Sequence, residues 1–433
     1  MKYFDTFLFL YCFLTWSISS HSQTSYFPAN NGNVWETTSP SSLGWCQERI
    51  DSLYNFLSTQ NSKAFILLKD GKIVLEQYFN GQTATSNWYW ASAGKTLTAF
   101  MVGLAQQDGL LNLSDSTSQY LGAGWTNCSA EQEGFITIRN QLTMTSGLND
   151  GLADSFCTLD TCLEYLTDPG TRWAYHNAPY TLLDGVIEAA TGQTLNAYTS
   201  SKLGATGITG GFFQSGYNNV FVSNARSMAR FGLLMENKGT WNGTQIMTDT
   251  TYFHDMVNTS QSLNKAYGYL TWLNGKQNFM VPGLQTVFPG TLMPNAPAET
   301  FMALGANGQF INVVPSQNLV WIRMGDAPGN ELVPFLLNDQ IWEYINLLGC
   351  SGSITEENTL PFSIFPNPAK EMITISMLNK INNINPCKIL DASGRAIKSF
   401  NLSEKETQIS VSDLKTGVYF ITNGNSIQKL LIH

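Results

Sequence analysis

Charged side chains are scarce in this sequence. They make up only 13% of the 433 residues, and the acidic ones outnumber the basic ones to give a formal net charge of −9. No cluster of lysine and arginine interrupts the chain, so it lacks the basic patch with which proteins neutralise nucleic acid phosphates. We therefore expect no nucleic acid partner.

Histidine is equally rare. Of the four histidines in the chain, only His176 and His254 fall in its main body, and the Gly-x-Ser-x-Gly pattern of a nucleophile elbow is absent. These absences argue against a Ser-His-Asp hydrolase, and the shortage of histidine argues against a zinc hydrolase. We expect no metal and no cofactor, and we expect His176 to be structural or to line a cleft.

Apolar runs long enough to cross a bilayer are missing beyond the N-terminal leader. The leader has Lys2, an apolar stretch over residues 7–18 and then small polar residues, which is the layout of a secretory signal peptide. We expect residues 1–22 to be removed, leaving Gln23 as the new N-terminus. The mature protein would then be exported without a transmembrane segment.

Export makes disulfide bonds possible, because an oxidising compartment allows cysteines to pair. Cys157 and Cys162 enclose a loop short enough to close locally, and Cys46 and Cys350 belong to helices at the two ends of the main domain. The alternative is that several cysteines are ordinary buried thiols, because connectivity cannot be deduced from one sequence. The six cysteines that follow the leader are Cys46, Cys128, Cys157, Cys162, Cys350 and Cys387.

Residues 351–361 are small and polar without an apolar period, which is typical of a linker. Residues 40–350 before it have a mixed pattern. Helical spacing over Ser42–Gln60 is followed by a hairpin pattern around Asp70-Gly71. Near the end, a strand, turn and strand over Phe310–Gly325 precede a helical pattern over Asn330–Gly349.

This symmetry of the two ends predicts an α+β fold. One antiparallel sheet would be built from both chain ends and covered by helices, while the middle, about residues 96–292, would form a mainly helical lobe. A cleft between the two lobes is the expected place for a site. Residues 362–433 show short alternating strands, which predict a small β-sandwich without a recognisable active site.

The segment WASAGKTLTAF, residues 90–100, carries two overlapping signals. A phosphate-binding loop needs a glycine at position 89, where the chain has Tyr89, so a nucleotide site is excluded. Helical spacing follows the segment and places Ser92 at a helix start with Lys95 one turn later on the same face. A buried lysine amine with a lowered pKa can act as a base toward such a serine.

Ser-x-x-Lys alone is weak evidence, because it recurs at Ser262, Ser412 and Ser426, and a helix-capping role for Ser92 is the simpler alternative. Two further motifs support the catalytic interpretation. LTMTSGL occupies residues 142–148, and Tyr175 with Asn177 forms a Tyr-x-Asn in a loop before a helix. Taken singly, that tyrosine and asparagine could be packing and loop residues.

In this order and spacing the three motifs resemble the serine β-lactamase superfamily. The match is to its class C-like branch of penicillin-binding proteins, D-amino acid peptidases and family VIII esterases, and it runs from about Ser42 to Gly349. The resemblance implies a β-lactamase/transpeptidase-like fold. It also implies that Ser92 is the acylated nucleophile and Lys95 its base or proton relay. Tyr175 would shuttle the proton to the leaving group, and Asn177 would hold the Lys95 amine and contact the substrate.

The family's third motif, Lys-Thr-Gly or a variant with histidine, is where this sequence departs. The literal Lys415-Thr416-Gly417 lies in the tail, beyond the linker. The segment that fits is Phe301–Val314, in which Ala306 stands at the basic position. Gly308 and Gln309 would follow along the cleft edge.

The Gln309 backbone N–H would join that of Ser92 in an oxyanion hole. The alternative is that this glycine-containing segment is only a turn. Without a cation at position 306, neutral esters or amides are favoured over β-lactams and D-peptides. We expect a secreted serine hydrolase that forms an acyl-enzyme with an ester, amide or β-lactam bond of a small or peptide-like substrate. The alternative is a penicillin-binding or surface-recognition protein with little or no turnover.

The tail has a resemblance of its own. FPNPAKEMITI, DASGRAI and LKTGVYFI are similar to the C-terminal sorting domain of type IX secretion substrates in Bacteroidetes. That resemblance implies a β-sandwich that engages the type IX secretion machinery and directs the protein to the cell surface or the medium. A carbohydrate-binding or merely stabilising module is the alternative.

Overall fold

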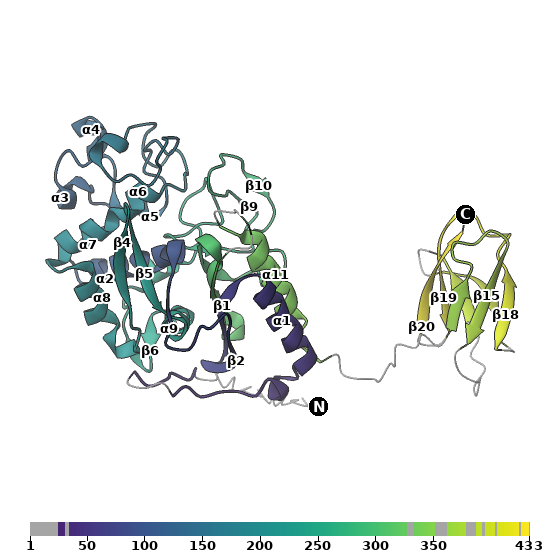
Figure 1. Ribbon diagram of the computed structural model, residues 1–433. Coiled ribbons are helices and arrows are strands. Elements are labelled where there is room, and N and C mark those ends of the chain that lie inside the picture. Colours follow the sequence, from purple (N-terminus) through teal and green to yellow (C-terminus); the bar gives the residue numbers. More distant parts are fainter. Residues whose placement is uncertain are drawn as a thin grey trace, which may run out of the picture. The chain divides into compact units, whose positions relative to one another are not determined.

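The computed structural model describes residues 25–30, 34–326, 329, 333–350, 362–377, 387–391, 395–402, 405–423 and 426–432. The chain divides into two compact units, residues 1–350 and 351–433 (Figure 1). The expected signal peptide and linker lie outside the described residues.

The first unit is built on a six-stranded antiparallel sheet with the strand order β2-β1-β13-β12-β11-β8. Its strands are β1 (Ser62–Lys69), β2 (Lys72–Tyr78), β8 (Trp272–Leu273), β11 (Phe301–Gly305), β12 (Gln309–Val314) and β13 (Leu319–Gly325). β1 pairs with β13, so both chain ends build the sheet as predicted. The turn at Asp70-Gly71 joins β1 to β2, with φ angles of 52° and 77°.

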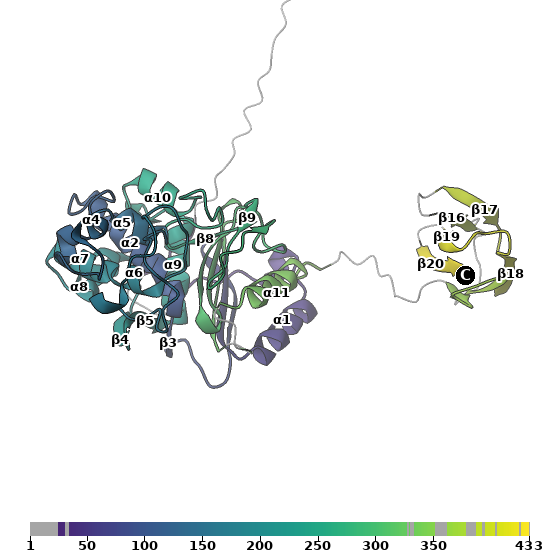
Figure 2. The same cartoon turned by 90° about the horizontal axis from the view of Figure 1, so that it is seen from above.

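Helices cover both faces of this sheet (Figures 1 and 2). α1 (Gln47–Thr59) and α11 (Phe335–Asn346) pack side by side, and α9 (Ala225–Glu236) packs on β12 and β13. α1 starts later than the sequence predicts, because residues 40–43 form a separate 3-10 turn that ends at Gly44 with φ 72°. A disulfide between Cys46 and Cys350 joins the two ends of the unit.

The middle of the chain forms the second lobe. Its helices are α2 (Gly94–Gln107), α3 (Ser118–Leu121), α4 (Ala130–Gly134), α5 (Ile138–Leu142), α6 (Asn177–Thr181), α7 (Leu183–Thr191), α8 (Leu195–Leu203) and α10 (Thr250–Met256). Its strands are β3 (Asn87–Tyr89), β4 (Gly211–Ser215), β5 (Asn218–Asn224), β6 (Thr240–Trp241), β7 (Thr244–Gln245), β9 (Asn278–Phe279) and β10 (Phe288–Pro289). α2 is buried along nearly its whole length, and most of its residues are apolar or small. It contacts both α7 in the lobe and β11 in the large sheet, and thereby fixes the lobe to the sheet.

The second unit consists of two antiparallel sheets, β14-β15-β18 and β17-β16-β19-β20. The strands are β14 (Phe362–Phe365), β15 (Met372–Met377), β16 (Cys387–Leu390), β17 (Ala396–Phe400), β18 (Glu406–Ser410), β19 (Gly417–Asn423) and β20 (Ser426–Ile432). Alternate residues such as Ile373, Ile389 and Ile421 form one buried cluster. The predicted β-sandwich is therefore confirmed.

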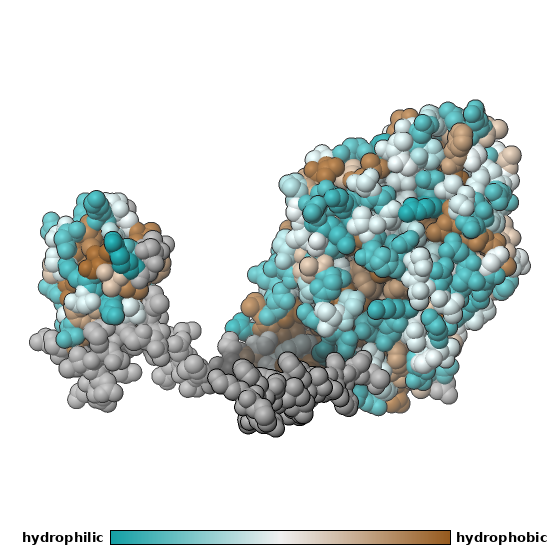
Figure 3. Space-filling view, turned by 180° about the vertical axis from the view of Figure 1, so that it is seen from behind, coloured by the Kyte–Doolittle hydropathy of each residue, from teal (hydrophilic) through white to brown (hydrophobic). Residues whose placement is uncertain are grey.

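The surface seen in Figure 3 is mostly polar in both units, with small scattered apolar patches. In the described ranges, every helix is too short or too polar to span a bilayer.

Candidate active site

Ser92 lies in a short 3-10 turn, Ala91–Ala93, directly ahead of α2. Trp90 anchors this turn, because its backbone N–H donates to Phe221 O (2.8 Å) and its indole N–H donates to Ser223 Oγ (2.8 Å). Ala91 has a φ of 46°, a left-handed conformation that is strained for a residue with a side chain. Such strain is typical of functional turns, and this one presents the Ser92 hydroxyl to a cavity.

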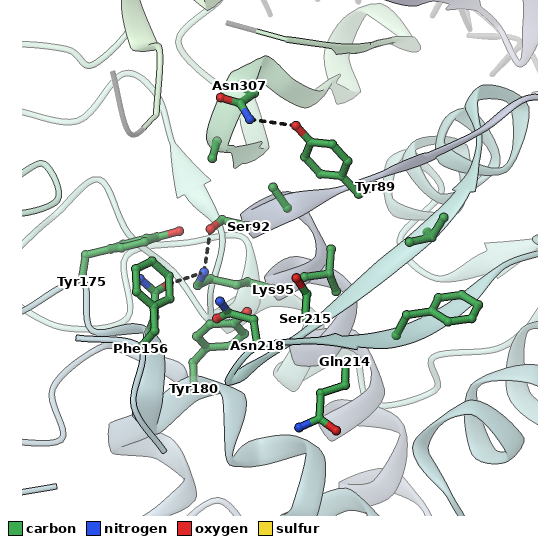
Figure 4. Close-up of a pocket in the computed structure, with 16 residues that line it drawn as sticks. Tyr89, Ser92, Lys95, Phe156, Tyr175, Tyr180, Gln214, Ser215, Asn218 and Asn307 are labelled. Atoms are coloured by element: carbon green, nitrogen blue, oxygen red, sulfur yellow. Dashed lines mark hydrogen bonds between the residues drawn. The ribbon is translucent and has the colours of Figure 1, made fainter. Parts of the chain in front are cut away.

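Lys95 brings the serine and the Tyr-x-Asn motif together. Its Nζ donates hydrogen bonds to Ser92 Oγ (2.7 Å) and to Asn177 Oδ1 (2.9 Å), as Figure 4 shows. The side chain is buried, and burial lowers the pKa of the Lys95 amine well below its usual value. No carboxylate pairs with Lys95 in the described part of the chain. The predicted proximity of Ser92, Lys95 and Asn177 is present in the structure.

Tyr175 completes this group. Its hydroxyl points toward Ser92 (Figure 4) and interacts with that side chain, although the two hydroxyls do not meet regular hydrogen-bond geometry. Burial raises the pKa of Tyr175, so its phenol stays protonated at neutral pH. The ring stacks on Trp272 at 5.7 Å and meets the edge of Tyr267 at 6.3 Å.

The LTMTSGL segment has a structural role in this site. Met144 O accepts a hydrogen bond from the Ala174 N–H (2.9 Å), directly before Tyr175. Leu142 O accepts from the Leu270 N–H (2.9 Å), in the segment that carries Tyr267 and Trp272. The motif thus holds the backbone on which the tyrosine and its aromatic neighbours are placed.

The end of β11 passes close to Ser92. A Cβ at Gly305 would lie 2.6 Å from Trp90 O, 2.8 Å from Ala93 N and 3.1 Å from Ser92 N, so a side chain has no room there. Residues 306–308 then form a turn into β12. Asn307 donates from Nδ2 to the Tyr89 hydroxyl (2.7 Å) at the edge of the cavity. Ala306 and Asn307 line the cavity.

Gly308 and Gln309 do not line the cavity. Gln309 is fully buried, with Nε2 donating to Gly325 O and Oε1 accepting from the Gly325 N–H. Its side chain is therefore committed to the sheet, and only its backbone could contribute to a substrate site. The oxyanion role of this N–H stays a prediction.

Arg323, on β13, lies behind the 306–308 turn. Its Nη1 donates to Asn307 O (3.1 Å) and Gly308 O (2.7 Å), and its Nε donates to Ser62 Oγ (2.9 Å). Nη2 donates to Gln60 O and Asp326 O. These bonds use all five N–H donors of the guanidinium. Arg323 therefore fixes the turn and has no N–H donor left for another partner.

The cavity has a volume of about 480 Å³. Lys95 is the one basic side chain among the described residues that line it, and the other lining groups are apolar or neutral polar. The wall opposite Ser92 comes from β4 and β5, and Phe156 closes one side. The lining residues that sequence reasoning missed include Phe156, Tyr180, Phe213, Asn218, Val220 and Val222.

Of these missed lining residues, Tyr180 could have been predicted from the sequence. It follows Asn177 by three positions on α6, so the two side chains share a helix face. The wall from β4 and β5 had no such signal, because only the tertiary fold brings it to Ser92.

Neither histidine takes part in this group. His176 is buried but does not line the cavity, and burial lowers its pKa to about 4, so it is neutral at pH 7. His254 lies on α10 with an exposed side chain beside Asp255. Among the described residues, no cluster of three or more histidine, cysteine or acidic side chains could hold a metal ion.

A family model described as Beta-lactamase matches residues 60–344. The chain belongs to the beta-lactamase family. A second model, described as the secretion system C-terminal sorting domain, matches residues 363–433. The two resemblances inferred from the motifs are confirmed.

Individual relatives are distant. An uncharacterized protein of Alkalihalophilus pseudofirmus, BpOF4_21049, is 23% identical over 61% of this chain and 83% of its own length. A proposed 6-aminohexanoate-dimer hydrolase from Bacillus anthracis superposes with a TM-score of 0.56 at 18% identity, covering 77% of this chain and 93% of that one. A family VIII carboxylesterase superposes with a TM-score of 0.52 at 15% identity, covering 70% and 99%. These structural likenesses show that the beta-lactamase family member shares its fold with proteins of different activities.

Proposed function

We propose that this beta-lactamase family member is a serine hydrolase in which Ser92 is acylated by an ester or amide substrate. The observation that carries the proposal is the buried Lys95 amine, 2.7 Å from Ser92 Oγ and 2.9 Å from Asn177 Oδ1. Burial favours the neutral form of that amine, and a neutral amine has the lone pair needed to accept the serine proton.

The two titratable partners of Ser92 have different roles in this mechanism. Burial lowers the pKa of Lys95 and raises that of Tyr175, so the amine is the base and the phenol is the acid. Lys95 takes the proton as the Ser92 Oγ–acyl bond forms, while Asn177 Oδ1 keeps one amine N–H in place. Tyr175 then gives its proton to the leaving group and recovers one from Lys95. In deacylation the same path runs in reverse with water as the nucleophile.

Negative charge on the carbonyl oxygen needs backbone donors. The Ser92 N–H at the start of α2 is one of them, and the positive end of that helix favours the same charge. We expect the second donor from the segment 305–309, where Gly305 brings β11 against the Ser92 backbone. The Gln309 N–H is the donor predicted from the sequence.

The substrate proposed for this cavity is neutral and largely apolar around its scissile bond. Ala306, the neutral Asn307–Tyr89 pair and the fully engaged Arg323 leave no cation for a substrate carboxylate among the residues that form this edge. The apolar wall suits an aliphatic or aromatic acyl group. The similar structures described as a carboxylesterase and a 6-aminohexanoate-dimer hydrolase are consistent with ester or amide cleavage.

The experiment compares p-nitrophenyl esters, the corresponding anilides and nitrocefin as substrates of the purified protein, with Ser92→Ala as the control. We expect Ser92-dependent turnover of esters that exceeds turnover of nitrocefin. Labelling by a fluorescent penicillin without turnover of any substrate would instead support a penicillin-binding or surface-recognition protein. Turnover that survives in Ser92→Ala would contradict the proposal.

We also propose that residues 362–433 direct the protein through type IX secretion to the cell surface or the medium, as their family match suggests. A chain truncated at Thr359 should remain inside the cell envelope, whereas the full chain should leave it. Release of the truncated chain at the rate of the full chain would contradict this role.

A further inference from the structure

The Lys95 amine is enclosed by aromatic faces. Its Nζ lies 3.9 Å from the ring centroid of Tyr180 and 4.9 Å from that of Tyr175. Both rings are buried, and the distance to Tyr180 is well inside the range in which a cation is attracted to a ring face. This attraction grows as the cation is withdrawn from water, and the Lys95 side chain is buried.

Among the described residues, the other titratable groups around Lys95 are neutral at pH 7. Tyr89 on β3 and the two tyrosines have pKa values that burial raises, and the same holds for Tyr267 behind them. Asn218, Val220 and Val222 face the cavity from β5, and Ala306 and Asn307 face it from the hairpin turn, so neither element brings a charge.

Asp184 and His176 are two further titratable groups of this lobe. Asp184 follows Tyr180 by four residues, and burial raises its pKa to about 8, so it is mostly protonated at pH 7. Burial lowers the pKa of His176 to about 4, so it is uncharged. The protonated form of Lys95 is therefore stabilised by two hydrogen-bond acceptors, Ser92 Oγ and Asn177 Oδ1, and by the ring faces.

Burial alone would make Lys95 a poor proton acceptor, because the ammonium would have lost its hydration without a counter-charge. A base works best when its proton affinity suits the working pH. The two acceptors at 2.7 and 2.9 Å offset part of the desolvation, and the electron-rich face of Tyr180, 3.9 Å from Nζ, is the nearest ring that adds to them.

We propose that Tyr180 is a positioning residue whose ring face sets the proton affinity of Lys95. This inference rests on the proposed hydrolase function and adds a role for a residue that neither accepts nor donates the transferred proton. The ring face is the active feature, so the Tyr180 hydroxyl is dispensable and phenylalanine is a sufficient replacement.

The test replaces Tyr180 by phenylalanine and then by phenylalanines carrying one, two and five ring fluorines. Fluorine withdraws electron density from the ring face while the side chain keeps nearly the same shape. The neutral amine is the active base, so kcat/KM for a p-nitrophenyl ester rises with pH through the pKa of Lys95. The acid limb is the part of this pH profile in which activity rises from low pH. A weaker ring face destabilises the ammonium and lowers the pKa of Lys95, which moves the acid limb to lower pH.

We expect Tyr180→Phe to keep the wild-type acid limb. Each added fluorine should shift the limb downward, reaching about one pH unit for the pentafluoro side chain. If Tyr180 had a purely structural role, the substitutions would instead lower the maximum kcat/KM without moving the acid limb. Because the series is graded, the members with one and two fluorines give the trend even if the last one does not fold.

Phe212 is the matched control, since it is buried against Phe221 in the same lobe but does not line the cavity. Pentafluorophenylalanine at this position should leave the limb unchanged. The pH dependence of fluorophosphonate labelling of Ser92 gives a second measurement that needs no turnover.

An unmoved limb across the series at position 180, with Ser92 still labelled and active, would overturn the role of Tyr180 and leave the hydrolase function intact. Activity and labelling that persist in Ser92→Ala would instead overturn the hydrolase function itself.

Discussion

Lys95 Nζ and Asn177 Oδ1 lie 2.9 Å apart, although 82 residues separate them in the sequence. This contact fixes the amine between α2 and α6 and leaves it beside Ser92. An amide oxygen orients the amine without adding a negative charge. The contact therefore lets the buried amine stay neutral, which an acidic residue at position 177 would prevent.

Asn177→Asp tests that interpretation. A carboxylate at this distance stabilises the ammonium and raises the pKa of Lys95 by roughly 1–3 units. Because the neutral amine is the active form, the acid limb of kcat/KM should move to higher pH, with a loss of more than ~10-fold at pH 7 that is recovered in alkali. Asn177→Ala, in contrast, should lose ~10- to 100-fold and not recover in alkali, since it removes a hydrogen bond and adds no charge. A wild-type limb in Asn177→Asp would contradict the assignment of Lys95 as the base.

Ala306→Lys should change the choice of substrate. The new cation would stand at the cavity edge beside Asn307, where a substrate carboxylate has no partner. We expect kcat/KM for an ester with a carboxylate on its acyl chain to rise by ~10-fold or more, in line with the attraction of two charges about 4 Å apart near a protein surface. Ala306→Met, of similar length and no charge, should show no such gain. The neutral ester should be cleaved equally by both variants, and an equal gain for both esters would refute the charge argument.

Gly305→Ala should reduce activity through a local clash. The added Cβ would meet Trp90 O at 2.6 Å and Ala93 N at 2.8 Å, so either β11 or the Ser92 turn must move. A displacement of about 1 Å at a nucleophile can cost ~100-fold in rate, and the clash itself should cost about 1–3 kcal/mol of unfolding free energy. Gly134→Ala is the control, because a Cβ there would have no neighbour within 4 Å. Full activity in Gly305→Ala would show that this close approach is unimportant.

The Cys157–Cys162 disulfide should control selectivity for the acyl group. Phe156 lines the cavity and directly precedes Cys157, and the disulfide lies within a wider segment whose ends are joined by Asn149 N–H donating to Glu164 O (2.9 Å). Replacing both cysteines by serine should release Phe156 and raise KM for a p-nitrophenyl butyrate ester by ~5-fold, with little effect on the acetate.

The Cys46–Cys350 disulfide is the matched control, because it joins the two chain ends at α1 and α11. Its loss should lower the unfolding free energy by about 2–4 kcal/mol without changing acyl selectivity. If the two double variants show the same acyl selectivity, the Cys157–Cys162 disulfide does not control it.

Local patterns were sufficient for much of the fold and for the centre of the site. The Asp70-Gly71 turn and the helical spacing after Ser92 depend on neighbouring residues, so sequence reasoning predicted both correctly. Two pairs of candidate site residues could be found because the members of each pair lie within one turn of chain. These pairs are Ser92 with Lys95, and Tyr175 with Asn177. Their order along the sequence supplied the remaining specificity.

What the sequence did not reveal depends on contacts between distant segments. Arg323 carried no motif, yet it holds the 306–308 turn through Asn307 O and Gly308 O. Phe156 lines the cavity from the segment beside the Cys157–Cys162 disulfide, and Val222 is placed by the pairing of β5 with β3. The start of α1 was misplaced because the left-handed Gly44 ends a separate turn before it.

The most direct test of the central claim is to trap the acyl-enzyme. The protein would be mixed with a slowly deacylating p-nitrophenyl ester, quenched in acid and digested, and the peptide that contains residues 90–100 would be sequenced by mass spectrometry. We predict one acyl group per protein, located on Ser92, together with a stoichiometric burst of p-nitrophenol and neither signal in Ser92→Ala. An acyl group on another residue, or a burst that persists in Ser92→Ala, would contradict the account.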